Sequence, residues 1–152
     1  MTKNTILLAK YLYAKGIDSS LRIQKILFFL RVEEKRNNFE SGYFKPKDNF
    51  QAWIYGPVNV ESFKYMQKYF NNDIEKEEIL LLDDDLEKNK ILIEEIDKIF
   101  GKYLEKYRYK APSTLVDESH RNLSWINARG DLDKDEPCNT YMKEDKSFIE
   151  FI

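Results

Sequence analysis

FQAWIYGPVNV, residues Phe50 to Val60, is the most informative stretch of the sequence, because its apolar pattern changes in the middle. Up to Ile54 the side chains alternate with the period of a short strand that has two covered faces. Gly56-Pro57 stops this pattern, because glycine tolerates positive φ and proline fixes φ and has no N–H. Residues then recur at helical spacing: Phe63, Met66, Gln67 and Phe70. The stretch predicts a strand over 50–54, a tight turn at Gly56-Pro57 and a helix.

Two helices are expected before this stretch. The first runs from about Thr5 to Lys15, and Gly16 is its stop signal. Residues 18–20, Asp-Ser-Ser, offer N-cap candidates for the second. The apolar stripe of the second helix is unusually broad, formed by Ile23, Ile26, Leu27 and Leu30 and widened by Phe28 and Phe29. We interpret it as a core helix touched on several sides; the alternative is a partner groove near Phe28.

The rest of the chain predicts further helices and loops. Residues 37–49 form a connection in which Tyr43 and Phe44 begin a strand that pairs with 50–54. The acidic run 73–85 is interpreted as a solvated loop with one buried segment, or as a surface for a basic partner. A long helix follows from Leu86 to about Tyr109, limited by Pro112. Thr114 and Asp117 have capping-box spacing before a short helix over 115–121. Residues 131–137 are predicted to be a polar loop. The apolar C-terminus is predicted to dock as a helix or a tail.

The expected fold is mainly α with a small β-hairpin, in a single compact helical domain over residues 1–152. The chain is long enough to bury a core without disulfides or metals. Seven residues are expected in that core: Ile26, Leu27, Leu30, Ile54, Met66, Ile96 and Phe100. No apolar run approaches the length that spans a bilayer, the N-terminus lacks a signal-peptide pattern, and Cys138 is the only cysteine. A cytoplasmic protein is the simplest interpretation.

The chemistry of the sequence favours no enzyme. His120 is the only histidine, which excludes any site that needs two histidine ligands, and a Cys138–His120 pair has no specificity beyond composition. The five glycines form no phosphate-binding loop. We therefore expect no catalytic residue, no metal and no cofactor. A net charge of −2 makes nucleic acid an unlikely partner.

Three residues have two interpretations each. His120 is either fixed by a local hydrogen bond or a catalytic or ligand-binding group. Trp53 is either a buried plug between strand and helices or an exposed anchor of the kind found at binding hot spots. Gln24 interrupts an apolar helix, and because a buried glutamine must find partners, we expect it to hold the Gly56-Pro57 turn.

Three blocks of the sequence resemble the SocA-like, or Panacea, domain family. The helix block, residues 21–29, resembles the family's L-x-x-Q-K pattern through Gln24 and Lys25. The hairpin block, residues 52–58, resembles its A-W-x-x-G-P-V core through Ala52, Trp53, Gly56, Pro57 and Val58. The late block, residues 119–129, resembles its T/S-H-x-x-x-x-W-x-x-A-R pattern through His120, Trp125 and Arg129. The blocks follow the family's order and span most of the chain.

The resemblance implies an antitoxin-like module that neutralises a bacterial or phage toxin by direct contact; some family members are phage-associated proteins. The implied partner is a cognate toxin from a neighbouring gene, with a cellular protease as a second candidate. The contact is expected at Tyr43, Trp53, Tyr55, Gly56 and Pro57, since aromatic anchors carry much interface energy.

Two other classes of function remain as alternatives. One is a small enzyme centred on His120, for which a pocket joining His120, Trp125 and Trp53 would speak. The other is a DNA-binding regulator of its own operon. Its basic surface would comprise Arg22, Lys25, Arg31, Lys35 and Arg36, although Glu33 and Glu34 interleave and no helix-turn-helix signature is visible.

Overall fold

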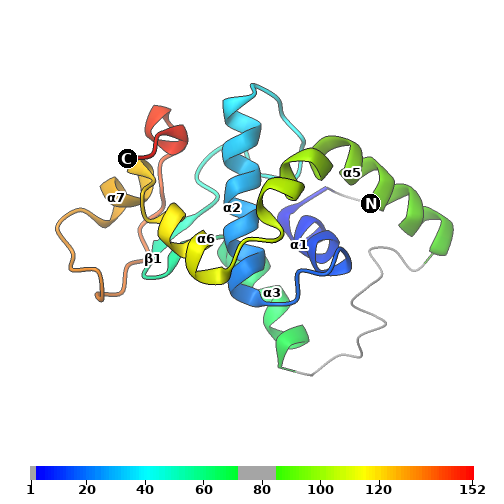
Figure 1. Ribbon diagram of the computed structural model, residues 1–152, viewed down its shortest axis with the longest axis horizontal. Coiled ribbons are helices and arrows are strands. Elements are labelled where there is room, and N and C mark those ends of the chain that lie inside the picture. Colours follow the sequence, from blue (N-terminus) through cyan, green and yellow to red (C-terminus); the bar gives the residue numbers. More distant parts are fainter. Residues whose placement is uncertain (1–2, 72–84) are drawn as a thin grey trace.

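Helix α2, Ser20–Arg36, lies at the centre of the molecule, and most other elements pack around it (Figure 1). The computed structural model describes residues 3–71 and 85–152. Twelve consecutive residues of α2, from Ile23 to Glu34, are buried, because helices cover it on several sides. The interpretation of this helix as a core element is therefore confirmed.

The elements confirm a mainly α fold with one small antiparallel sheet. Six α-helices lie in the described residues, and the bounds of the elements around α2 are as follows: α1 Thr5–Ala14, β1 Gln51–Trp53, β2 Gly56–Val58, α3 Val60–Phe70, α5 Leu86–Tyr107, α6 Pro112–Ser119, α7 Leu123–Arg129 and the 3₁₀ helix η1 Lys146–Ile149. The acidic run 73–85 lies outside the described residues except for Asp85, which is the N-cap of α5.

Side-chain caps fix where most of these helices begin. The Asn4 side chain accepts from the Leu7 N–H at 2.8 Å, and Ser19 does the same for Arg22 at the start of α2. Asn59 caps α3 by accepting from the Ser62 N–H at 2.9 Å. Each cap satisfies one of the N–H groups that the first turn of a helix leaves without a partner.

The hairpin differs from the prediction in its second strand. Gly56-Pro57 is not the strand-to-helix turn: it belongs to β2, and the turn is at Ile54 and Tyr55. The register pairs Gln51 with Val58, Ala52 with Pro57 and Trp53 with Gly56. Gly56 has a φ of +109°, so it bends the chain out of the turn.

The partner that was predicted for the first strand is also wrong. Tyr43 and Phe44 lie in irregular structure and form no strand. On its other side β1 is joined instead to the C-terminal segment, because the Ala52 N–H donates to the Thr140 carbonyl at 2.9 Å. The segment after α7 thus extends the small sheet from far along the sequence.

The core contains six of the seven predicted residues. Ile26, Leu27, Leu30, Met66, Ile96 and Phe100 are all buried. Ile54 is only partly buried, because it occupies the hairpin turn and not a strand interior.

Two boundaries after α5 differ from the prediction. Pro112 starts α6, where the missing N–H of proline is harmless, so the helix begins before Thr114. The N-cap is Ala111, which has no side-chain hydrogen bond, so the predicted Thr114–Asp117 capping box is wrong. The C-terminus docks as η1 and a short tail, with Phe148 fully buried and Phe151 bridged to Asn122.

Candidate functional site

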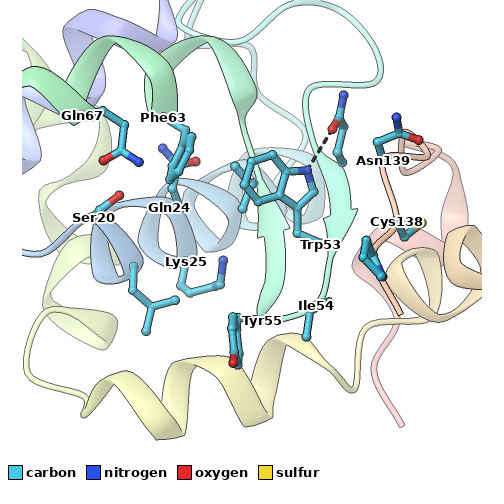
Figure 2. A pocket seen from close by; sticks show the side chains of 14 residues that line it. Ser20, Gln24, Lys25, Trp53, Ile54, Tyr55, Phe63, Gln67, Cys138 and Asn139 are labelled. Carbon is cyan, nitrogen blue, oxygen red and sulfur yellow. Dashed lines mark hydrogen bonds between the residues drawn. The ribbon is translucent and has the colours of Figure 1, made fainter. Parts of the chain in front are cut away.

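A cavity of about 790 Å³ lies beside the β-hairpin, between the hairpin, α2 and α3. Figure 2 shows the indole of Trp53 between Phe63 of α3 and the Cys138–Asn139 segment, with Lys25 of α2 below Gln24 in the view. Trp53 meets Phe63 edge-on at 5.1 Å between ring centroids, and its Nε1–H donates to the Gln51 side chain at 2.8 Å. Trp53 is therefore half-buried and held in one orientation, between the two predicted roles of plug and anchor.

Five side chains from the helix and late blocks bind the backbone of the hairpin and of the residue that follows it. In the helix block, the Lys25 ammonium donates to the Pro57 carbonyl at 2.7 Å, and the Gln24 oxygen accepts from the Asn59 N–H at 2.8 Å. The late block supplies three donors: His120 to the Ile54 carbonyl at 2.9 Å, Trp125 Nε1 to the Trp53 carbonyl at 2.9 Å, and Arg129 to the Ala52 carbonyl at 3.0 Å.

These bonds bring the three sequence blocks together at one place. The five motif residues named above end on the hairpin block or next to it, and four of the hairpin's carbonyl groups thereby find partners inside the protein. Gln24 acts one step later than predicted, since it holds Asn59, the N-cap of α3, and also donates to Ser62 Oγ at 3.1 Å. The motif residues therefore fix the shape of the hairpin through hydrogen bonds to its backbone.

Gly56 is required by the close approach of the hairpin to α2 and α6. A Cβ at this position would lie 2.9 Å from Lys25 Cε and still closer to Ser119 Oγ. Any side chain would push the hairpin away from the residues that hold it. Ser119, which was not predicted as a site residue, thus packs closely against Gly56 and leaves no room for a side chain there.

Lys25 is a buried cation without a counter-ion. Its relative exposure is 1 %, its hydrogen bond goes to a neutral carbonyl, and no carboxylate pairs with it among the residues that the structure describes. Burial lowers the pKa of Lys25 to about 7, because desolvation disfavours the ammonium form. Near neutral pH the Lys25 side chain is therefore divided between ammonium and amine, and its charged form has no counter-ion in the described residues.

His120 has the contacts of a structural residue. Its ring stacks on Trp125 at 4.3 Å between centroids, and its Nε2–H must be the donor to Ile54, because a carbonyl can only accept. Burial lowers the pKa of His120, and the hydrogen bond to Ile54 opposes this. The cavity is lined by Trp53 but by neither His120 nor Trp125, so the pocket that would favour the enzyme alternative is not formed by these three residues.

The five predicted partner-binding residues are displayed very differently. Tyr55 is 67 % exposed at the hairpin turn, and Trp53 lines the cavity. Tyr43 is 1 % exposed and packs edge-on against Phe100, so its assignment to a binding surface is wrong. Gly56 and Pro57 are buried and shape the hairpin without offering surface.

The predicted basic surface on α2 is also reduced. Arg31 is fully buried, in ion pairs with Glu34 and Glu144, and Lys25 is buried beneath the hairpin. The interpretation of these two residues as exposed is wrong, because Arg31 pairs with Glu144 and Lys25 with the Pro57 carbonyl, both distant in sequence. The DNA-binding alternative loses two of its five basic residues.

Several lining residues were missed by the sequence analysis. Phe63 and Gln67 of α3 were recognised only by their helical spacing, yet both face the cavity (Figure 2). Ser20 and Leu21 at the start of α2, with Pro137 to Asn139 from the loop after α7, complete the walls. A glutamine at an apolar helical position, as at Gln67, was the one signal that pointed to them.

Comparison with protein-family models, with curated proteins and with solved structures gave no match to this chain. In the described ranges 3–71 and 85–152, no helix is long and apolar enough to cross a bilayer, and no group of three His, Cys, Asp or Glu side chains is arranged to hold a metal ion.

Proposed function

We propose that this chain is an antitoxin-like, Panacea-type module that neutralises a cognate bacterial or phage toxin by direct contact. The observation that carries the proposal is the hairpin. Four side chains of the helix and late blocks bind its backbone, a fifth binds the Asn59 N–H just after it, and it presents exposed Tyr55 beside the wall of a cavity. The residues that resemble the family's motifs therefore serve one purpose, the display of the hairpin.

A fixed hairpin suits an inhibitor. A surface that is ordered before binding loses little conformational entropy on association. Aromatic side chains such as Tyr55 and Trp53 are the kind that carry most of the energy at interfaces. The turn also lies at the end of the sheet, so a partner can reach Tyr55 and the cavity together.

The proposed partner is a toxin from a neighbouring gene, and both proteins act in the cytoplasm. A cellular protease is a second candidate partner, which would degrade the module and release the toxin. The class of toxin does not follow from the resemblance.

The proposal predicts that Tyr55→Ala weakens neutralisation. The neighbouring gene is expressed from an inducible promoter together with wild-type or variant chain, and growth and complex affinity are measured. Loss of one aromatic anchor should raise Kd at least about tenfold, equivalent to about 1.4 kcal/mol.

The matched control is Tyr109→Ala. Tyr109 is 79 % exposed but lies beyond the end of α5 and does not line the cavity, so this variant should rescue growth like the wild type. The proposal fails if no neighbouring product is toxic and a pull-down from the native host recovers no stoichiometric protein.

A further inference from the structure

The charge of the cavity is one-sided. Lys25 is the only charged residue among the fourteen described residues that line it, and none of them is an aspartate or glutamate. The first turn of α2 contributes Ser20 and Leu21 to the same wall. Because the N-terminal end of a 17-residue helix carries partial positive charge, the helix adds to the field of Lys25.

The remaining lining is apolar with an amide rim. Apolar walls come from Trp53, Phe63, Val58 and Leu21. Four carboxamide side chains line the cavity, of which Gln51, Gln67 and Asn139 lie nearer the surface, whereas Gln24 is buried and bound to Asn59 and Ser62. Side-chain amides both donate and accept, which matches the N–H and C=O groups of a peptide backbone.

We propose that this cavity binds a segment of the partner protein in which an aspartate or glutamate lies next to an aromatic or aliphatic residue, and that the carboxylate pairs with Lys25. The inference rests on the proposed function and adds to it the chemistry of the partner. It is argued from charge complementarity: the cavity presents a buried cation without a counter-ion, a helix N-terminus and apolar walls.

The energetics favour a carboxylate at this position. A buried ammonium with one neutral acceptor has lost most of its hydration without gaining an ion pair. The lowered pKa of Lys25 reports the same imbalance. An arriving carboxylate stabilises the charged form and excludes water from the apolar walls at the same time.

The test uses three small probes and the full chain. N-acetyl-Glu-Phe-amide carries a carboxylate and a ring, and N-acetyl-Gln-Phe-amide is its neutral match. NMR titration follows the Trp53 indole N–H and the Lys25 side-chain methylenes. We expect saturable shifts with the Glu peptide and a Kd at least fivefold higher for the Gln peptide. Equal affinities, or no shift at Lys25 up to the solubility limit, overturn the proposal.

The third probe distinguishes a peptide from a small acid. 4-Phenylbutyrate has the ring and the carboxylate but no peptide backbone to meet the amide rim. We expect it to bind more weakly than the Glu peptide. Tighter binding would identify the occupant as a small carboxylic acid and overturn the peptide assignment.

Variants separate charge from packing. Lys25→Met should abolish the preference for the Glu peptide, and a retained preference contradicts the pairing. If Lys25→Met does not fold, Phe63→Ala on the cavity wall should weaken both peptides by the same factor and leave the preference intact, while a changed preference contradicts the pairing. If the chain prefers the Glu peptide but no neighbouring gene product is toxic, only the proposed function is contradicted. If growth rescue depends on Tyr55 but the chain does not prefer the Glu peptide, only this inference is contradicted.

Discussion

Lys25 takes part in the packing of the hairpin and, in our proposal, in the binding of a partner's carboxylate. The sequence placed it in the helix block but also on an exposed basic face, since lysine is rarely buried. Its burial follows from the hairpin: Gly56 leaves room for the lysine chain, and Pro57 offers a carbonyl to its ammonium. Neither fact can be read from the helix alone, because both partners lie about thirty residues later.

The pKa of Lys25 predicts a rise in stability with pH. The folded value is about 7 and the unfolded value 10.5, so the unfolded chain binds more protons between these limits and the free energy of unfolding increases as pH rises. From pH 7 to pH 9 we expect a gain on the order of 2 kcal/mol in the wild type relative to Lys25→Met. Urea unfolding at both pH values measures it.

All other titratable groups are present in both the wild type and Lys25→Met, so their contributions cancel in the difference between the two unfolding free energies. The range ends at pH 9 because unfolded tyrosines ionise near pH 10, whereas burial, with added effects of Asp97, raises the pKa of Tyr11, so stability falls again there. If the two proteins gave parallel pH profiles, the pKa of Lys25 would not be lowered in the folded state, and the prediction would be wrong.

At the scale of elements, the long helices could be predicted and the hairpin could not. Helical spacing located α2 and α5, because buried stripes repeat over many turns. The three-residue strand β2 has no such period, and Gly-Pro is an uncommon strand sequence. Its turn, Ile54-Tyr55, lacks the Asn or Gly that signals a two-residue hairpin. Tertiary hydrogen bonds hold this strand, and local propensity does not.

The hairpin predicts a difference between two glycines. Gly56 and Gly16 both have positive φ, at +109° and +99°, but an added Cβ meets Lys25 and Ser119 at Gly56 and nothing within 4 Å at Gly16. Gly16→Ala should show backbone strain of about 1–2 kcal/mol. Gly56→Ala should cost roughly 1–3 kcal/mol more, because it also overpacks the contact.

Chemical denaturation of the two variants measures this difference. Gly56→Ala should also shift the Trp53 indole resonance, whereas Gly16→Ala should leave it unchanged. Equal losses of unfolding free energy in the two variants would mean that the hairpin can move off α2 freely.

At the scale of the whole molecule, the three blocks were visible in the sequence but their meeting point was not. Their order along the chain was part of the resemblance that we noted, and the structure adds that the helix and late blocks bind the hairpin's backbone. Every residue has a backbone carbonyl, so the sequence does not show which carbonyl groups accept these hydrogen bonds, and the geometry of the site could not be predicted. The cavity was missed for the same reason, since its walls come from α2, α3, the hairpin and the loop after α7.

The C-terminal segment ties these parts together through Glu144. One oxygen accepts from Arg31 Nε of α2 at 2.8 Å, and the other accepts from the Asn49 N–H at 2.8 Å, just before β1. Both side chains of the Arg31–Glu144 pair are almost fully buried. Asn49 is bound in turn by Asn59 at the start of α3, so one carboxylate links α2, the hairpin entry and the C-terminus.

Glu144→Ala should therefore destabilise the whole fold, by about 3 kcal/mol, because it removes one partner of a buried ion pair while Arg31 keeps only part of its compensation from Glu34. Urea unfolding gives the value. Glu105→Ala is the control: its pair with Arg108 at 3.0 Å lies on the surface, with Glu105 58 % exposed, and should be worth less than about 1 kcal/mol. If the two variants lose the same stability, the Glu144 network does not join the C-terminal segment to the core. If only Glu144→Ala unfolds at a lower urea concentration, and the Trp53 signal changes in the same transition, the hairpin and the C-terminus are parts of one cooperative unit.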